Sequence, residues 1–367
     1  MNNHFNNIEN HPFTAAITSW YNKNKRSLPW RESASPYHIW LSEIILQQTR
    51  VAQGLPYYNH FVSKYPKVAD LARASEDEIL RSWQGLGYYS RARNLHKCAQ
   101  MIVSKHSGEF PRTMRDLLDL PGIGKYTAAA IASLAYGEAV PVVDGNVYRV
   151  LARYFNIATD IGSSKAFGQF YDLSLSLIDK KNPGDYNQAV MEFGAIYCKP
   201  QNPDCENCVL QDGCEAKAKL LQKERPIKKR KPKSRKRYFN YFLILHQGKV
   251  LMRQRTERDI WQGLYEFLLI ENSQPSTGDI LALPELKKFR DSSVEIITSD
   301  KILRHVLTHQ LLYVNFAVIS IEKNTKLIDE LSTDKFRWYD WQEVEELPKP
   351  VLLANFLDTY LNSINLQ

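Results

Sequence analysis

Apolar residues recur at helical spacing through the first part of the chain. Between residues 12 and 25 the apolar side of a predicted helix carries Phe13, Ile17, Trp20 and Tyr21. Further helices are predicted from near Tyr37 to Val51, between residues 55 and 106, and over residues 144–156, 165–179 and 184–197. The pattern predicts that this part of the chain is mainly α-helical.

From Tyr238 onward the pattern changes to short apolar runs. Residues 241–245 and 250–255 are predicted strands on either side of a turn at Gln247 and Gly248. Later apolar runs cover residues 261–267 and 313–319, and residues 340–344 and 351–357 suggest closing helices. The second part is therefore predicted to be an α+β domain.

A basic segment separates the two parts. Residues 223–237 contain ten lysines and arginines, one acidic residue and two prolines. Such a segment is too charged to pack into a core, so it is predicted to be a linker. The expected division is residues 1–222, the linker 223–237 and residues 238–367. Basic linkers of DNA enzymes and nuclear-localisation signals look alike at this level.

Composition adds only a little to this division. With 367 residues, the chain is long enough for one or two domains with full cores. The net charge of +8 is compatible with a polyanionic partner. No apolar stretch reaches membrane-spanning length, and the first residues lack the pattern of a signal peptide. A bacterial, cytoplasmic and nucleoid-associated protein is the expectation.

Four of the five cysteines lie within seventeen residues, as Cys198, Cys205, Cys208 and Cys214. This density indicates a metal site and not a disulfide framework. Four thiolates in one loop can hold a tetrahedral zinc ion or a [4Fe–4S] cube, and composition leaves both open. Cys98 lies outside the pattern and is expected to be a buried helical thiol.

The segment from residue 120 to residue 150 combines two features with chemical potential. Gly122 and Gly124 permit a tight hairpin, and a helix starts at Lys125, so its first N–H groups can bind a phosphate. Asp144 follows as a lone carboxylate among valines. An ordinary αα-hairpin with Asp144 as an N-cap explains the same residues equally well.

Glu43 lies on a predicted helix, close to an apolar stripe that contains Ile39 and Leu46. A desolvated carboxyl group there would have a raised pKa and could donate a proton. Most glutamates are exposed, so the pattern alone favours a surface residue at the edge of the stripe.

The segment 84–94 carries glycines, apolar tips and arginines. Leu86 and Tyr88 could fill the space left by an unstacked base, and Arg91 and Arg93 would then lie near phosphates. The alternative is a helix–helix turn with buried aromatic residues.

Several of these segments resemble known families. Residues 120–125 and 143–147 resemble the hairpin and the aspartate segment of helix-hairpin-helix DNA glycosylases. Residues 41–49 are similar to the signature of MutY-type adenine DNA glycosylases. This resemblance implies that Glu43 protonates the purine and that Gln48, beside Thr49, wedges into the duplex.

The resemblance extends to the other candidate segments. Residues 84–94 look like the family's intercalating loop, with Tyr88 as the wedge. The cysteine spacing is that of the endonuclease III and MutY iron–sulfur loop, which implies a [4Fe–4S] cluster. Residues 187–194 resemble the last core helix and imply that Gln188, together with Trp30 and Arg31, lines the adenine pocket.

Tyr126 follows the hairpin, where bifunctional relatives have a lysine nucleophile. The resemblance therefore implies a monofunctional glycosylase, in which Asp144 stabilises the sugar cation and Tyr126 and Asn146 position the reacting groups. Thymine mismatch glycosylases can also have tyrosine at this position, so Tyr126 does not distinguish them from adenine glycosylases. Glu43 is the residue that favours adenine as the substrate.

The second domain resembles the Nudix fold, without the glutamate-rich catalytic helix after Phe267, so pyrophosphate hydrolysis is not expected. In MutY-type enzymes this domain reads 8-oxoguanine with a phenylalanine-serine-histidine loop, and here Leu307, Thr308 and His309 stand in that place. A β-turn threonine and a partly exposed histidine are the alternative.

The sequence thus predicts a mainly α helix-hairpin-helix glycosylase domain with two helical lobes and an iron–sulfur loop, followed by a Nudix-like α+β domain. The expected partner is double-stranded DNA with A·8-oxoG or A·G mispairs, bound by a monomer. The residues expected at the DNA are Gln48, Thr49, Arg50, Leu86, Tyr88, Gly122, Gly124, Lys125, Thr308 and His309. A bifunctional lyase, a thymine mismatch glycosylase and a non-enzymatic scaffold remain as rivals.

Overall fold

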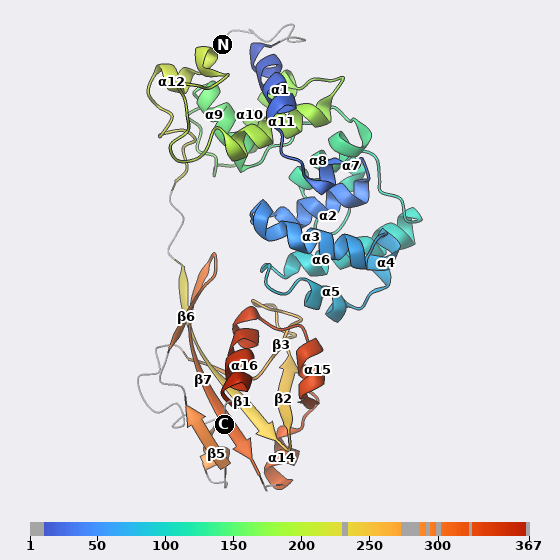
Figure 1. The fold of residues 1–367 in the computed structure, drawn as a ribbon, viewed down its shortest axis with the longest axis vertical. Helices are drawn as coiled ribbons and strands as arrows, with labels where there is room; N and C mark the ends of the chain where they lie inside the picture. The colour runs from blue at the N-terminus through green and yellow to red at the C-terminus, as the bar shows by residue number, and fades with distance from the viewer. Residues whose placement is uncertain are drawn as a thin grey trace. The chain divides into compact units, whose positions relative to one another are not determined.

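The computed structural model describes residues 11–229, 234–272, 286–290, 294–298, 302–322 and 325–364. The chain divides into two compact units (Figure 1). The helical unit comprises residues 1–73 and 94–230, and the C-terminal unit comprises residues 74–93 and 231–367. Residues 74–93 thus group with the second half of the chain, which the sequence pattern did not predict.

The predicted helices are present, with small shifts at their ends. Up to residue 218, the α-helices among the described residues are α1 (Pro12–Asn24), α2 (Pro36–Leu46), α3 (Val51–Lys64), α4 (Val68–Arg73), α5 (Glu76–Ser82), α6 (Ser90–His106), α7 (Met114–Leu117), α8 (Lys125–Tyr136), α9 (Gly145–Tyr154), α10 (Ala166–Leu177), α11 (Pro183–Ile196) and α12 (Glu215–Ala218). Two short 3-10 helices are η1 (Pro29–Arg31) and η2 (Gln211–Gly213).

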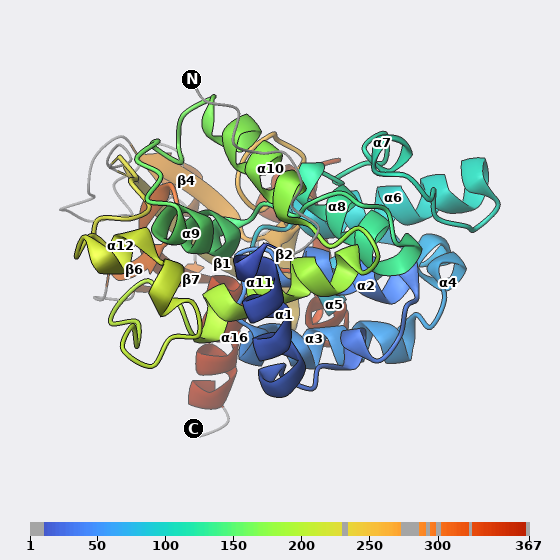
Figure 2. The same cartoon turned by 90° about the horizontal axis from the view of Figure 1, so that it is seen from above.

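The first helix confirms the amphipathic pattern. Phe13, Ile17, Trp20 and Tyr21 are all buried. In both views α1 lies beside α11 (Figures 1 and 2). The Trp20 ring meets the Phe193 ring edge-on with 4.8 Å between centroids. These residues form one core together with the apolar faces of α9 and α10.

The helix predicted from Tyr37 to Val51 is two helices. α2 ends at Leu46, and α3 begins at Val51. Between them Gln48 has a φ of 58°, a left-handed conformation that no helix continues through. The break leaves Gln48 exposed at a turn instead of on a helix face.

The C-terminal unit is built on one mixed sheet. Its strands among the described residues are β1 (Arg235–His246), β2 (Lys249–Gln254), β3 (Tyr265–Glu266), β4 (Leu268–Asn272), β5 (Val294–Thr298), β6 (Leu303–Val306), β7 (Gln310–Ile321) and β8 (Phe336–Asp340). β1 and β7 pair in parallel at the centre, while β2 and β4 both pair antiparallel with β1. The predicted turn between β1 and β2 has positive φ at Gln247 and Gly248.

Both faces of this sheet are covered by helices. Tyr241 and Leu243 point to one face, where α15 (Trp341–Glu346) and α16 (Val351–Ile364) pack. Phe242 and Ile244 point to the other face, which α13 (Lys287–Arg290) and α14 (Thr325–Leu331) cover. Burial on both sides explains why residues 241–245 of β1 are a continuous apolar run without polar alternation. The α+β prediction is confirmed.

The structure corrects the end of the predicted linker. Of residues 223–237, residues 230–233 lie outside the described part of the chain, but Arg235 to Arg237 belong to β1. Arg237 is buried and forms ion pairs with Asp259 and Glu271. A run of basic residues looked incompatible with packing only because its acidic partners lie more than twenty residues away in the sequence. Among the described residues, no helix has both the length and the apolar character needed to cross a membrane.

Candidate active site

Glu43 is buried in the last turns of α2, so the surface alternative is wrong. Its Oε2 accepts a hydrogen bond of 2.5 Å from the hydroxyl of Tyr126. Burial raises the pKa of Glu43 to about 7, although the Tyr126 hydrogen bond opposes the shift. The carboxyl group is therefore substantially protonated near neutral pH.

Asp144 is the N-cap of α9, as the structural alternative predicted. Its Oδ1 accepts hydrogen bonds of 2.8 Å from the backbone N–H groups of Asn146 and Val147, and its Oδ2 accepts one of 2.8 Å from Asn146 Nδ2. Burial raises the pKa of Asp144, while these donors favour the carboxylate. The cap thus holds the carboxylate in one orientation, which is compatible with a chemical role.

Tyr126 connects the two acids. It lies in the first turn of α8, and the negative charges of both Glu43 and Asp144 act on its hydroxyl. Burial raises the pKa of Tyr126, so the hydroxyl keeps its proton and acts as a donor. Glu43 and Asp144 are also close enough to interact electrostatically. Two acids about one hundred residues apart in the sequence therefore share one site.

The glycine hairpin before α8 has the predicted geometry. Gly122 has a φ of 76°, and a Cβ there would lie 2.6 Å from the Cβ of Asn94. Gly124 is the N-cap of α8 and supplies no side-chain hydrogen bond to the first-turn amides. The Nζ of Lys125 lies 4.4 Å from the centre of the Phe167 ring. Amides at such a helix start suit a phosphate oxygen.

A cavity of about 410 Å³ in the helical unit is lined by Trp30, Arg31 and Gln188, the residues that the resemblance assigns to the adenine pocket. Arg31 Nε donates to Gln188 Oε1 at 3.1 Å, and Arg31 Nη2 donates to Glu192 Oε2 at 2.8 Å. Glu43 does not line this cavity, but the positive charge of Arg31 acts to lower the pKa of Glu43.

Glu192 was not singled out from the sequence. It is almost fully buried, and besides the hydrogen bond from Arg31 it accepts a fork from Arg26, with both distances 2.7 Å. Burial opposes ionisation, but the arginine hydrogen bonds dominate and lower the pKa of Glu192 to about 2. An ionised Glu192 therefore fixes Arg31 against the cavity.

Arg149 was also missed, although it connects Asn146 to the cysteine loop. Its Nη2 donates to Asn146 Oδ1 at 2.8 Å and to the carbonyl of Gly194 at 2.7 Å, and its Nε donates to the carbonyl of Cys198 at 2.8 Å. Arg149 and Arg153 are both buried and lie four residues apart on α9. Two arginines four residues apart lie on the same side of a helix, and this spacing among apolar residues was the sequence feature that could have indicated a buried pair.

The four predicted cysteine ligands line one cavity. Arg153 Nη1 lies 3.2 Å from Cys198 Sγ, and the backbone N–H of Leu210 lies 3.4 Å from Cys208 Sγ. Hydrogen-bond donors around sulfur suit thiolates that ligate a metal cluster. Within the part of the chain that the structure describes, no three histidine, cysteine or acidic side chains converge on a point that could hold one metal ion. Cys98 is fully buried in α6, apart from this loop, as predicted.

Replacing Arg149 with glutamine is expected to destabilise the helical unit and slow catalysis. The variant leaves the buried carbonyl of Gly194 without its side-chain donor, at a cost of about 1–3 kcal/mol. The carbonyl of Cys198 keeps only its 3.5 Å contact with Arg153 Nη1. The variant also frees the Asn146 side chain that holds Asp144. We expect a lower melting temperature, a reduced visible absorbance per chain from any iron–sulfur cluster, and slower base excision. Arg115→Gln, on the short surface helix α7, is the control, and equal behaviour of the two variants would contradict the assignment.

The intercalating-loop candidates differ partly from expectation. Tyr88 is 42% exposed and has a φ of 50°, whereas Leu86 is buried. Arg91 is buried too, so its expected place near phosphates is wrong. It donates to the carbonyl of Gly87 at 3.1 Å, and its guanidinium lies 5.1 Å from the Trp83 ring. The reason is that α6 already begins at Ser90, which turns Arg91 back into the loop.

Arg93 also differs from expectation. Its Nη1 donates to the carbonyl of Gln262 at 2.5 Å, within the C-terminal unit. The guanidinium is therefore engaged with protein backbone instead of facing a phosphate.

Thr308 and His309 form the exposed tip of the hairpin between β6 and β7. The Leu307 N–H closes this hairpin by donating to the Gln310 carbonyl at 2.8 Å. The hydroxyl groups of Tyr88 and Thr308 are in contact. Both belong to the C-terminal unit, so this unit itself brings together two segments that the sequence analysis placed at the DNA.

Comparison with protein families finds matches in three segments of the chain. Residues 41–171 match the HhH-GPD superfamily of base excision DNA repair proteins. Residues 198–214 match the iron–sulfur binding domain of endonuclease III, and residues 240–359 match the NUDIX domain. The helix-hairpin-helix, iron–sulfur and Nudix-like predictions are confirmed.

Solved structures resemble the helical part. A thermostable thymine-DNA glycosylase is 32% identical, with a TM-score of 0.53, over 56% of this chain and 95% of that chain. A non-covalent endonuclease III–DNA complex has 23% identity and a TM-score of 0.50, which indicates a shared fold.

Curated relatives span both units. The adenine DNA glycosylase of Buchnera aphidicola subsp. Acyrthosiphon pisum (strain APS) is 31% identical over 351 residues, covering 94% of this chain and 97% of that protein. The human adenine DNA glycosylase is 44% identical over 221 residues, covering 58% of this chain and 40% of the human protein. The chain belongs to the adenine DNA glycosylases, the base excision repair enzymes that remove adenine by hydrolysing its N-glycosyl bond.

Proposed function

We propose that this enzyme excises adenine paired with 8-oxoguanine or guanine, that it is monofunctional, and that it acts as a monomer on double-stranded DNA. The observation that carries the proposal is the shared site of Glu43, Tyr126 and Asp144, in which Glu43 also interacts electrostatically with Arg31 of the cavity wall. One acid there is poised to donate a proton, and the other is oriented as a carboxylate.

The mispaired adenine leaves the base stack and enters the cavity. Trp30 supplies an apolar wall, and Arg31 and Gln188 supply polar groups. Glu192 holds Arg31, which in turn donates to Gln188. An amide can form paired hydrogen bonds with adenine, so Gln188 is the candidate for base recognition.

Glu43 then donates its proton to N7 of the adenine, which makes the base a better leaving group. Thymine has no equivalent ring nitrogen, and this difference favours adenine as the substrate. The Tyr126 hydroxyl donates to Oε2 of the same carboxyl group and keeps it in place.

As the N-glycosyl bond breaks, positive charge develops on the sugar. Asp144 stabilises this oxocarbenium character, as carboxylates do in glycosidases. Asn146 fixes Asp144 through its side-chain amide at 2.8 Å. No lysine stands in the place of Tyr126, so the enzyme releases the base and leaves the strand intact.

The iron–sulfur group is proposed to be a [4Fe–4S] cluster held by Cys198, Cys205, Cys208 and Cys214. The donor set fits, because the four thiols line one cavity and N–H groups point at two of the sulfurs. When bound, the cluster cross-links the loop, and Arg149 ties that loop to Asn146.

The remaining candidates are proposed to hold the duplex. Gln48, Thr49 and Tyr88 would occupy the gap left by the extruded adenine, while Lys125 and the amides around Gly122 and Gly124 bind phosphates. Thr308 and His309 would hydrogen-bond the opposite base.

The pH dependence of excision tests the assignment of Glu43. Activity needs Glu43 protonated, so the single-turnover rate is expected to fall as the pH rises through about 7. The Tyr126 hydrogen bond lowers the pKa of Glu43, so Tyr126→Phe should move this alkaline limb upward by about half to one pH unit. Tyr186→Phe removes a buried hydroxyl near Ser174 and is the control. If Tyr126→Phe left the alkaline limb of the pH–rate profile unchanged, Glu43 would not be the group that titrates there, and its assignment as the acid would be refuted.

One assay separates the candidate activities. Duplexes with A·8-oxoG, A·G and T·G are incubated with the enzyme and scored for strand breaks before and after alkali treatment. The proposal expects alkali-dependent breaks at adenine, fastest opposite 8-oxoguanine, and no covalent adduct with borohydride. Cleavage at T·G would support thymine removal, which the resemblance to a thymine-DNA glycosylase keeps as the second candidate.

A further inference from the structure

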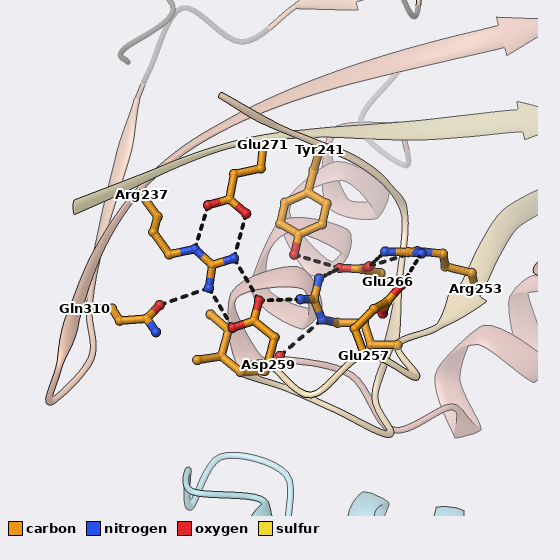
Figure 3. Close-up of polar contacts among 10 residues, drawn as sticks. Arg237, Tyr241, Arg253, Glu257, Asp259, Glu266, Glu271 and Gln310 are labelled. Atoms are coloured by element: carbon orange, nitrogen blue, oxygen red, sulfur yellow. Dashed lines mark hydrogen bonds and ion pairs between the residues drawn. The ribbon is translucent and has the colours of Figure 1, made fainter. Parts of the chain in front are cut away.

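A network of buried arginines and partly buried acids connects β1 and β4 to the loop of residues 256–264 in the C-terminal unit (Figure 3). Arg237 forks onto Glu271 at 2.6 and 2.7 Å and onto Asp259 at 2.7 and 2.8 Å. Arg255 forms two ion pairs, from Nη2 to Asp259 Oδ2 at 3.0 Å and from Nη1 to Oε2 of the fully buried Glu266 at 2.6 Å. Asp259 therefore accepts from two buried arginines at once.

This network fixes the shape of the loop. Arg255 Nε donates to the carbonyl of Ile260 at 3.1 Å. The backbone closes behind it, because Gly263 N–H donates to the Arg255 carbonyl at 2.7 Å and Arg255 N–H donates to the Leu264 carbonyl at 2.8 Å. Buried ion pairs contribute little net stability, but they can specify one geometry.

The same network reaches the hairpin that carries Thr308 and His309. Arg237 Nη1 donates to Gln310 Oε1 at 3.1 Å, and Gln310 closes that hairpin. One arginine thus sets the position of two loops, the loop of residues 256–264 and the hairpin tip.

Trp261 lies in the first of these loops in an unusual conformation. Its φ is 61°, which lies in the left-handed region. This backbone conformation is sterically unfavourable for a residue with a Cβ and is adopted more readily by glycine or asparagine. Its ring is 5.9 Å from the His305 ring and is only partly buried. A bulky residue kept in such a conformation points to a function.

Trp261 lines a cavity together with residues already proposed to touch DNA. The other walls include Leu86, Tyr88, Thr308 and His309, all in the C-terminal unit. An indole presents a large π-face, and the hydroxyl and imidazole groups present polar atoms. This combination suits a purine base, which needs both stacking and edge contacts.

We propose that Trp261 is a specificity-determining residue of the glycosylase, an aromatic wall for the base opposite the excised adenine, and that Arg237, Asp259 and Arg255 are its positioning residues. The inference rests on the proposed preference for 8-oxoguanine. Thr308 and His309 anchor the oxidised base in the cavity, and the anchored base then gains the contact with Trp261.

Two variants of Trp261 test this on the full-length enzyme. Trp261→Leu keeps the strained backbone but loses the π-face, whereas Trp261→Gly also relieves the strain. Both are expected to weaken binding to a duplex with a non-cleavable adenine analogue opposite 8-oxoguanine by about tenfold, the scale of one base–aromatic stack. Binding opposite guanine should fall much less, so the ratio of the two affinities drops.

Trp338→Leu is the matched control, because Trp338 is also partly buried but packs in the core on the opposite face of the sheet. It should leave the affinity ratio unchanged. Equal losses on both duplexes, or no loss, in either folded Trp261 variant would overturn the assignment of Trp261 alone. A wild-type enzyme without any preference for 8-oxoguanine would overturn both this inference and the proposed preference.

Asp259→Asn tests the positioning role. It weakens the ion pairs of both Arg237 and Arg255 while Trp261 remains. If the network acts through Trp261, Asp259→Asn should lower the same affinity ratio, and it should add little to Trp261→Gly in a double-mutant cycle. Full additivity would show that Asp259 does not act through Trp261 and would overturn this part of the proposal.

Discussion

Glu43→Gln is expected to abolish adenine release while leaving DNA binding intact. Glutamine keeps the size and the hydrogen bond from Tyr126 but has no proton to give. General-acid catalysis contributes about a hundredfold to ten-thousandfold, so the single-turnover rate should fall by at least that range. The measurement is base release from A·8-oxoG and A·G duplexes, together with the dissociation constant of each complex.

The control for this variant is Glu109→Gln. Glu109 is exposed at the end of α6, so its replacement makes the same chemical change away from the site. Turnover by Glu43→Gln at the wild-type rate would show that another group supplies the proton. A loss of DNA binding in step with activity would instead indicate that Glu43 holds the site together.

Asp144→Asn is expected to reduce excision about a thousandfold or more. The substitution removes the negative charge opposite the developing sugar cation, an effect of several kcal/mol in a water-excluded site. It also places an amide where Asp144 now accepts three hydrogen bonds, so the start of α9 should lose some stability. Excision rates and thermal melting separate the two effects.

Asp340→Asn provides the matched control for the capping role. Asp340 is the N-cap of α15 and accepts the backbone N–H of Glu343 at 2.8 Å, in the unit that lacks the two catalytic candidates. It should show a similar small change in melting and no large change in excision. If both aspartate variants lowered activity equally, the effect of Asp144 would be structural.

Much of the local structure could be predicted because it depends on neighbours in the sequence. The amphipathic spacing of Phe13, Ile17 and Trp20 predicted α1, and the apolar runs on either side of Gln247 and Gly248 predicted β1 and β2. The glycines of the hairpin and the Asp144 cap were likewise predictable from backbone and capping preferences. The cysteine spacing was sufficient for an iron–sulfur prediction, which the family comparison confirms.

Burial and pairing were not predictable in the same way. Exposure statistics favoured a surface position for Glu43, and only contacts with Tyr126 and the packing around α2 make it a buried acid. Arg91 and Arg237 were treated as residues for phosphates or solvent, yet each is buried against groups of its own unit. A charged side chain is buried only when distant residues supply its partners.

The sequence by itself determined the helices, the strands and the hairpin, because these follow from local spacing and backbone preferences. The candidate acids and cluster ligands were identified by the resemblance of their segments to a known family. Only the tertiary structure decided that Glu43 is desolvated, that Arg149 links Asn146 to the cysteine loop, and that Arg255, an ion-pair partner of Asp259, binds the backbone of the loop that carries Trp261. The physical reason is that desolvation and ion pairing depend on which residues meet in space, and those residues are far apart in the chain.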